Sequence, residues 1–251
     1  MRVRFALPVI LAAKLCLAQQ PSTDPDRDVT IKTLVPNILR DQKSIWLFPR
    51  KLDKPSALLP TAAFLLIGTA LVVGADPPVA HYFRNTTAFN GFNRSMPSTG
   101  TSAAIVAAPF ALYGAGMLRK DSKMTSTALL AGEALADSEI LTEILKPAVS
   151  RRRPSSLAPG GNFADTFAEG GNRFSSSRNS FPSGHAITAF AVATVVSRRY
   201  GKQHRWVPIV AYGASAAIGL SRLTRSAHYT SDVFVGAFLG YSISRFAVLR
   251  D

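Results

Sequence analysis

An uncharged stretch of twenty residues constrains this chain more than any other feature of its sequence. Residues 56–75, SALLPTAAFLLIGTALVVGA, contain no charged side chain. A helix needs about 20 consecutive apolar residues to cross the hydrocarbon core of a bilayer. A second uncharged run of eighteen residues, TSAAIVAAPFALYGAGML, covers 101–118. Both runs predict helices that lie in a membrane.

Four further helix-like segments follow, at 124–145, 183–197, 206–220 and 231–244. The first carries Glu133, Asp137 and Glu139, so it can span a bilayer only if these acids face other helices or a cavity. The other three are rich in Ala, Gly and Ser, which suits close helix packing. No alternation long enough for a sheet is visible. The sequence predicts an all-α, membrane-embedded bundle with six core helices in one domain, 56–249.

The chain begins like a secretory signal peptide. Arg2 and Arg4 precede an apolar stretch, and small residues at Cys16 and Ala18 suit cleavage after Ala18. Lys14 interrupts the apolar stretch, so an uncleaved anchor or a buried helix stays open for 1–18. Residues 19–55 predict a polar surface segment with one or two short helices, placed at the membrane interface by Trp46 and Phe48.

The charge balance points to an anionic partner. Lys and Arg number 29 against 15 acids, a net charge of +14, which suits nucleic acid, an anionic membrane or a phosphorylated substrate. No zinc-finger spacing, stacking-aromatic motif or basic-region heptad accompanies this charge, so we expect no nucleic-acid partner. Cys16 is the only cysteine, which excludes an intrachain disulfide and a cysteine metal site. The oligomeric state stays open.

Three polar clusters lie at the ends of predicted helices, at 146–154 (KPAVSRRRP), 182–185 (PSGH) and 221–232 (SRLTRSAHYTSD). Each has an ordinary explanation when taken alone. An Arg-rich turn often caps a helix, Ser183 is a suitable N-cap, and His228 with Asp232 has the i,i+4 spacing of a local helical pair. Only their combination suggests a site.

Together the clusters supply what phosphoryl transfer without a metal requires. Lys146, Arg153 and Arg222 are cations that can surround the oxygens of a phosphoryl group. Ser183 and Gly184 lie at a predicted helix N-terminus, where free backbone N–H groups favour an anion. We predict that these five residues bind a phosphate.

Two histidines can divide the chemistry. Asp232 lies one turn after His228 and could hold the proton on one ring nitrogen, which leaves the other nitrogen free as a nucleophile. His185 adjoins the phosphate cradle and is placed to protonate the leaving alkoxide and then to activate water. We therefore predict His228 as the nucleophile, Asp232 as its orienter and His185 as the general acid.

These positions carry a family resemblance. The pattern resembles the three-part signature of the type 2 phosphatidic acid phosphatase and vanadium haloperoxidase superfamily, and its eleven positions are Lys146, Arg153, Pro154, Pro182, Ser183, Gly184, His185, Ser221, Arg222, His228 and Asp232. The resemblance implies the same roles for these residues. It also implies a phosphohistidine intermediate with no metal and no cofactor.

Several functional alternatives remain at this level. We favour a phosphatase that acts on a phosphomonoester or diphosphate of a lipid in the cell membrane. A soluble periplasmic or secreted acid phosphatase of the same superfamily is the main alternative. A vanadate-dependent haloperoxidase and a protein that keeps the fold without catalysis are weaker ones, because these haloperoxidases are larger and soluble and because neither histidine is missing here.

Basic turns lie opposite the three clusters in the predicted topology, at RKDSK, SRRYGKQHR and the C-terminal LRD. The positive-inside rule then places the site on the periplasmic or outer side. Six spans would leave 19–55 in the cytoplasm, whereas a cleaved signal peptide would leave it outside. Either one of these two expectations is wrong, or 56–75 does not fully cross, since Pro60 permits a re-entrant or surface-lying helix.

Substrate selection would come from two segments expected to be loops, 76–101 and 155–181. Four other arginines near the clusters are expected to be solvated loop charges: Arg151, Arg152, Arg173 and Arg178. Arg225 falls at a free position of the signature and receives no role.

Overall fold

The computed structural model describes residues 29–48, 55–158, 160–163, 166–167, 172 and 174–249, and within these ranges it is helical without strands. The longer helices are α2 (Leu34–Trp46), α3 (Pro55–Ala70), α4 (Asp76–Asn85), α5 (Asn90–Ser95), α6 (Ser98–Arg119), α7 (Ser122–Val149), α8 (Gly184–Tyr200), α9 (Trp206–Thr224) and α10 (Thr230–Ile243). The predicted signal peptide and Arg173 lie outside the described residues.

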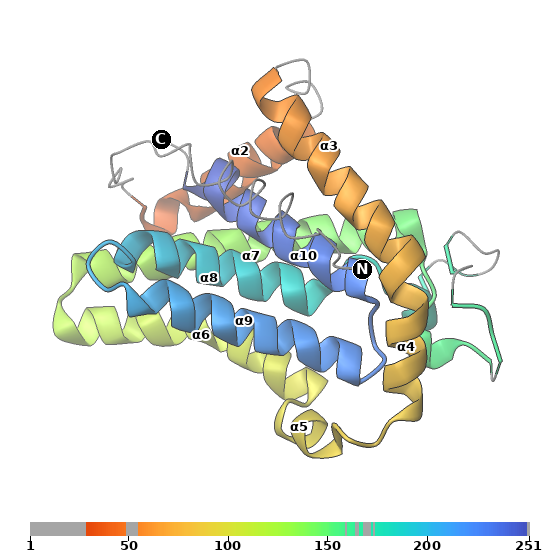
Figure 1. Ribbon diagram of the computed structural model, residues 1–251. Coiled ribbons are helices and arrows are strands. Elements are labelled where there is room, and N and C mark those ends of the chain that lie inside the picture. The colour runs from red at the N-terminus through yellow and green to blue at the C-terminus, as the bar shows by residue number, and fades with distance from the viewer. Residues whose placement is uncertain are drawn as a thin grey trace, which may run out of the picture.

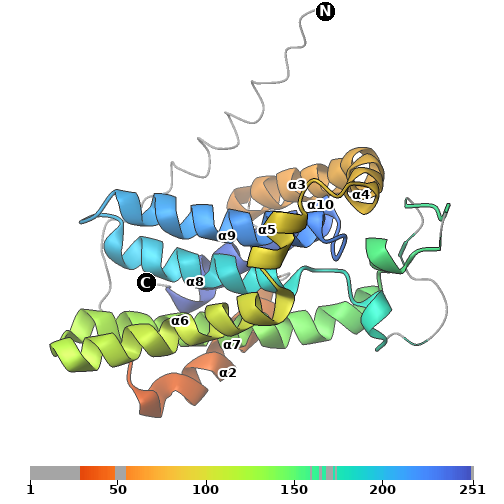
Figure 2. The same cartoon turned by 90° about the horizontal axis from the view of Figure 1, so that it is seen from below.

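Four helices pack lengthwise against one another in the order α6, α7, α8 and α9, and α10 lies across α7 and α8 (Figures 1 and 2). Short connections join α6 to α7 and α8 to α9, so neighbours run antiparallel. As a result, α7 and α9 end where α8 and α10 begin. The three predicted clusters therefore meet at one end of the bundle.

Small residues let α8 occupy the centre of the bundle. Its Ala186 and Ala191 are fully buried. On the facing helix, a Cβ added to Gly240 would lie 2.1 Å from the carbonyl oxygen of Ile187, and one added to Gly236 would lie 2.8 Å from that of Ser183. Only glycine allows α10 to approach α8 this closely. This contact fixes the start of α8 relative to the start of α10.

Helix α3 lies at the edge of the bundle and leans away from it (Figure 1). Its contact with α10 includes Phe64, which stacks on Phe238 with ring centroids 4.1 Å apart. The chain then passes through a π-helical turn, Leu71–Ala75, into α4. The expectation that 76–101 forms a loop is therefore wrong in part. Pro77 and Pro78 occupy the first turn of α4, where their missing N–H groups break no helical bond.

Part of the polar N-terminal segment covers the acids of α7. A single 3₁₀ turn, Ile31–Thr33, leads into α2. Asn37 donates to Glu133 at 2.6 Å, and Gln42 donates to Asp137 at 2.8 Å. Both acids are fully buried. The sequence required the acids of α7 to face other helices or a cavity. Helix α2 meets this requirement for Glu133 and Asp137.

Among the described residues, three stretches are long and apolar enough to cross a membrane: Leu58–Asn85, Ser98–Arg119 and Trp206–Thr224. The first has none of its most apolar window buried inside the protein. Large apolar side chains face outward along them, including Leu66, Val73, Phe110, Leu118, Ile209 and Val210. Such continuous apolar surface is unfavourable in water and favourable in lipid. The chain is a membrane protein, which disfavours the soluble alternative.

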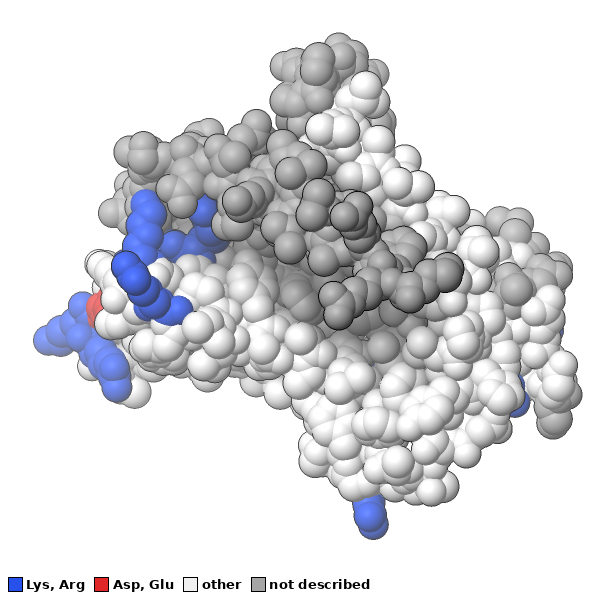
Figure 3. All heavy atoms as spheres, in the orientation of Figure 1, with Lys and Arg blue, Asp and Glu red and all other residues white. Residues whose placement is uncertain are grey.

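Basic residues gather at the end of the bundle opposite the clusters. On the face that Figure 3 shows, Lys and Arg concentrate where α6 meets α7 and α8 meets α9. The two connections at that end, together with the helix turns beside them, contain Arg119, Lys120, Lys123, Arg198, Arg199, Lys202 and Arg205. Elsewhere on this face the described atoms show few charged side chains.

Candidate active site

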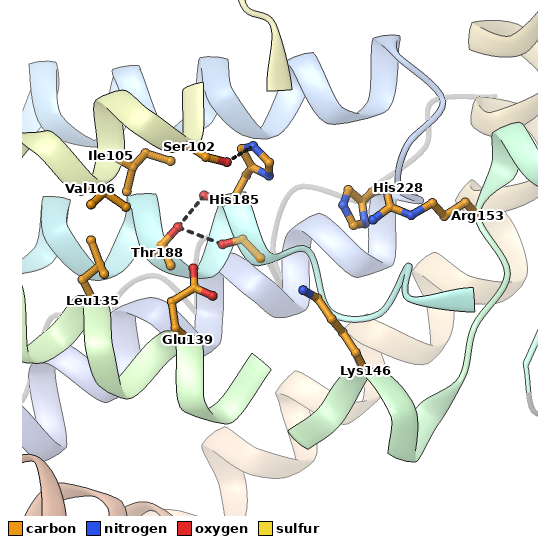
Figure 4. Close-up of a pocket in the computed structure, with 11 residues that line it drawn as sticks. Ser102, Ile105, Val106, Leu135, Glu139, Lys146, Arg153, His185, Thr188 and His228 are labelled. Carbon is orange, nitrogen blue, oxygen red and sulfur yellow. Dashed lines mark hydrogen bonds between the residues drawn. The ribbon is translucent and has the colours of Figure 1, made fainter. Parts of the chain in front are cut away.

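A cavity of about 200 Å³ lies where the three clusters meet. Five of the eight predicted site residues line it, namely Lys146, Arg153, Gly184, His185 and His228 (Figure 4). Its other lining residues are Ser102, Ile105, Val106, Leu135, Glu139 and Thr188. Residues from three helices, α6, α7 and α8, and from two loops thus form one cavity.

Two cations reach the cavity from the end of α7 and the loop that follows. Lys146 Nζ lies 2.8 Å from Glu143 Oε1, a carboxylate on the exposed side of the helix. Arg153 donates from Nε to Asn179 Oδ1 at 2.8 Å, which leaves its two terminal nitrogens for other acceptors. An anion in the cavity would therefore meet two positive charges.

The start of α8 supplies the predicted helix N-terminus. A Cβ on Gly184 would lie 3.8 Å from Lys146 Nζ, so the lysine stands directly in front of this backbone. Ser183 occupies the N-cap position without a side-chain capping bond. Its side chain is buried and lies outside the lining of the cavity, while its N–H donates to the carbonyl of Asp232 at 3.1 Å. In this structure Ser183 ties α8 to α10.

His185 faces polar groups of α6 and α9. Its Nε2 lies 3.1 Å from the carbonyl oxygen of Ser98, 2.9 Å from Ser102 Oγ and 3.3 Å from Arg222 Nη1. Burial lowers the pKa of His185 to about 4; the Ser98 bond opposes this shift, and the charge of Arg222 adds to it. His185 is therefore neutral near pH 7 in the absence of an anion.

Arg222 lies behind His185 and not in the lining of the cavity, which differs from the predicted position. Its side chain is 1% exposed, and it donates to Ser98 Oγ at 2.8 Å and to the Met96 carbonyl at 2.9 Å. The reason is geometric: Arg222 ends α9 where the segment between α5 and α6 offers oxygen acceptors. Among the described contacts, it meets the lining of the cavity at His185.

The orientation of His228 also differs from the prediction. His228 Nδ1 lies 2.6 Å from the carbonyl oxygen of Ser180 but 3.8 Å from Asp232 Oδ2. A backbone carbonyl accepts the Nδ1 proton, so Nε2 keeps its lone pair. Burial lowers the pKa of His228, although Asp232 opposes this shift. Asp232 acts indirectly, because it accepts a bond from Ser180 Oγ at 2.5 Å.

Asp232 belongs to a buried ionic network that the sequence did not reveal. Arg151 donates to Asp232 at 2.6 Å and to Asp76 at 2.7 Å. Ser231 bonds to Asp76 through its backbone N–H at 2.9 Å. Burial alone would raise the pKa of Asp232, but the charge of Arg151 brings it below its usual value. Asp232 is therefore ionised.

Arg151 corrects the expectation of a solvated loop charge. Its side chain is 1% exposed, and its guanidinium lies over the ring of Tyr229, 3.8 Å from the centroid. Two carboxylates and an aromatic face compensate its burial. Asp76 had no recognisable signal, since it lies 75 residues from Arg151 in a segment expected to be a loop.

The polar residues Ser102, Glu139 and Thr188 line the cavity although they were not predicted as site residues. Glu139 had been noted only as an acid that needs a cavity, and the structure provides one. Within the described ranges, no three potential metal ligands from His, Cys, Asp and Glu come together.

A family model matches the part of the chain that contains all three clusters. The model is that of the PAP2 superfamily, and it covers residues 127–250. The chain belongs to the PAP2 superfamily. This confirms the resemblance to the type 2 phosphatidic acid phosphatases.

Three curated proteins resemble this PAP2 chain, and all are named lipid A 1-phosphatase. The protein from Porphyromonas gingivalis is 42% identical over 25% of this chain and 14% of its own length. The proteins from Rhizobium etli and Rhizobium johnstonii are 36% and 35% identical over 41% of this chain, and over 41% and 39% of theirs. The matches thus span less than half of each relative.

Among solved structures, a transmembrane PAP2-type phosphatidylglycerolphosphate phosphatase from Bacillus subtilis resembles the chain with a TM-score of 0.42 and 20% identity. The match covers 86% of this chain and 92% of that one.

Proposed function

We propose that this PAP2 chain is a metal-independent phosphatase that removes phosphate from a membrane lipid. The observation that carries the proposal is the cavity itself, where Lys146, Arg153 and the start of α8 adjoin His185 and His228. The names of the three curated relatives support a lipid phosphate as the substrate. A phosphomonoester and a diphosphate would both present the same phosphoryl group to these residues.

The reaction proceeds in two displacements. Nε2 of His228 attacks phosphorus, the bond from phosphorus to the alcohol oxygen breaks, and His185 gives a proton to that oxygen. Water then attacks the phosphohistidine, His185 accepts a proton from it, and phosphate leaves with His228 restored. Lys146 and Arg153 stabilise the charge on the phosphoryl oxygens during both steps.

A bound substrate would also prepare the general acid. Neutral His185 is not a suitable general acid, because the loss of its ring proton would leave a negatively charged ring. The negative charge of a phosphate beside it raises its pKa and favours protonation. Binding and protonation of His185 are therefore linked.

The cavity faces the periplasm or the exterior in this proposal. Basic residues at the opposite end of the bundle favour the cytoplasmic side for that end. The substrate would then be a lipid of the outward-facing leaflet.

Phosphate release from a panel of lipid phosphates by the purified full-length protein in detergent tests the proposal. We expect release without added metal, no inhibition by a chelator and loss of activity in His228→Ala. His204→Ala is the matched control, because His204 lies in the exposed turn between α8 and α9. Full activity of His228→Ala, or loss of wild-type activity with a chelator, would disprove the mechanism.

A further inference from the structure

One carboxylate lines the cavity that the proposed function fills with an anion. Glu139 points into it from α7, beside Thr188 and between Leu135 and Lys146 (Figure 4). Among the residues that the structure describes, none donates a hydrogen bond to this side chain. An acid beside a phosphate is unfavourable unless it contacts another part of the substrate.

Lys146 acts on Glu139 as a nearby charge, which opposes the rise in the pKa of Glu139 that burial causes. Its ammonium is already paired with Glu143, whose carboxylate lies 2.8 Å away and whose side chain is 68% exposed. The charge of the lysine is thus compensated from outside the cavity. Glu139 remains as an acceptor inside it.

The lining of the cavity changes in character along α7. Leu135, Glu139 and Lys146 lie on one face of the helix because their spacings of four and eleven residues are close to whole turns. Lys146 follows Glu139 by about 10 Å along the axis, at about 1.5 Å per residue. The cavity therefore has a cationic end, an acceptor in the middle and an apolar end.

The neighbouring helices repeat this order. Ile105 and Val106 of α6 lie beside Leu135 at the apolar end (Figure 4). The hydroxyls near the middle are already engaged: Ser102 with His185 at 2.9 Å, and Thr188 with the carbonyl of Gly184 at 2.8 Å. Glu139 is the one carboxylate among the residues that line the cavity, and it is therefore the charged acceptor in this part of it.

A carboxylate accepts hydrogen bonds and repels anions. We propose that Glu139 selects substrates whose alcohol part carries a hydroxyl, amide N–H or ammonium group close to the phosphate, followed by hydrocarbon. It accepts a hydrogen bond from that group, and it disfavours a second phosphate at the same place. This inference rests on the proposed function and deepens it. It favours monophosphates of acylated sugars or amino alcohols over phosphatidic acid and over lipid diphosphates.

The test compares three substrates with matched acyl chains: an N-acylglucosamine 1-phosphate, a phosphatidic acid and an isoprenyl diphosphate. The full-length protein in detergent is assayed as wild type, Glu139→Gln, Glu139→Leu and Glu143→Gln. The last is the control, since it removes a carboxylate one turn away that lies outside the cavity. The measured quantity is kcat/KM for each pair of protein and substrate.

We expect Glu139→Leu to lower kcat/KM for the sugar phosphate about tenfold, as for loss of one charge-assisted hydrogen bond, and to change the value for phosphatidic acid less than twofold. Glu139→Gln should raise kcat/KM for the diphosphate, since it removes the repelling charge. Glu143→Gln frees Lys146, which meets the phosphoryl group that both monophosphates share, and it should leave the ratio of the sugar phosphate to phosphatidic acid unchanged.

Equal changes for all three substrates, or no change, would overturn the inference while leaving the phosphatase function intact. Absence of phosphate release from every substrate by wild type would overturn the proposed function itself. If Glu139→Leu does not fold, as judged by melting in detergent, the diphosphate result of Glu139→Gln decides the question.

Discussion

The reaction makes opposite demands on the half-buried His185 and the buried His228, although both lie near Arg153. The nucleophile must be neutral, and burial favours this by lowering the pKa of His228. The general acid must be protonated, yet burial lowers the pKa of His185 to about 4. The free protein near pH 7 is therefore ready for attack but not for proton donation.

The pH dependence of kcat/KM should show that the general acid is mostly unprotonated in the free protein. Above a pKa of about 4, the protonated fraction of His185 falls with each unit of pH. We expect log kcat/KM to fall by about one per unit between pH 6.5 and 8, where phosphomonoesters are mostly dianionic. The profile is measured with a soluble short-chain substrate. A profile that is flat over this range in wild type would contradict the assignment of His185.

The sequence was sufficient for the residues at the three clusters but not for their partners. The predicted lysine, arginine, glycine and histidines meet in one cavity because their spacing follows the ends of helices. Asp232 was expected to hold His228 directly, whereas the carbonyl of Ser180 does so. A backbone carbonyl leaves no signal in side-chain chemistry, so no inspection of residue types could identify it.

At the scale of helices, Arg151 joins three elements that are distant in the chain. It follows α7 and binds Asp76 at the start of α4 and Asp232 at the start of α10. Loss of one partner of a buried ion pair typically costs about 3–5 kcal/mol, because a charge is left unpaired. The network thus positions α10, and with it the loop before α10 that contains His228.

Arg151→Met should lower the melting temperature in detergent and reduce kcat much more than it raises KM. The first effect follows from two unpaired buried carboxylates, and the second from a displaced His228. Asp76→Asn should lower both the melting temperature and kcat, by smaller amounts than Arg151→Met. Arg225→Ala is the control, since this exposed arginine bonds only to the carbonyl of Asn93 among the described contacts. Normal kcat in folded Arg151→Met would show that the network is structural alone.

Sequence patterns identified the helices of the bundle but not the course of 76–101. The composition of that segment, rich in Asn, Pro and Gly, is typical of a loop. Its prolines instead occupy the first turn of α4, which a π-helical turn connects to α3. Composition cannot distinguish a loop from a helix that begins with proline.

The whole molecule has two chemically different ends. One end holds the cavity, and the other gathers the basic turns (Figures 3 and 4). Apolar surface along α3, α6 and α9 lies between them. In the proposed function these features favour the orientation predicted from the basic turns, with the cavity outside the cytoplasm.

Cysteine labelling of intact bacterial cells tests this orientation. In a Cys16→Ser background, Ser155→Cys lies at the cavity end and Gln203→Cys lies in the exposed turn between α8 and α9. We expect a membrane-impermeant maleimide to label only Ser155→Cys, and to label both after the membrane is permeabilised. Labelling of Gln203→Cys alone in intact cells would show that the orientation is the opposite of the proposed one.

The bond between Arg151 and Asp76 also sets a limit on protein engineering. Asp76 lies outside the segment 127–250 that the family model covers, yet its carboxylate compensates a charge inside that segment. A chimera that grafts 127–250 onto an amino-terminal half with no acid at position 76 would leave Arg151 with Asp232 alone of its two carboxylates. Such exchanges between homologues should therefore succeed only when position 76 is transferred together with position 151.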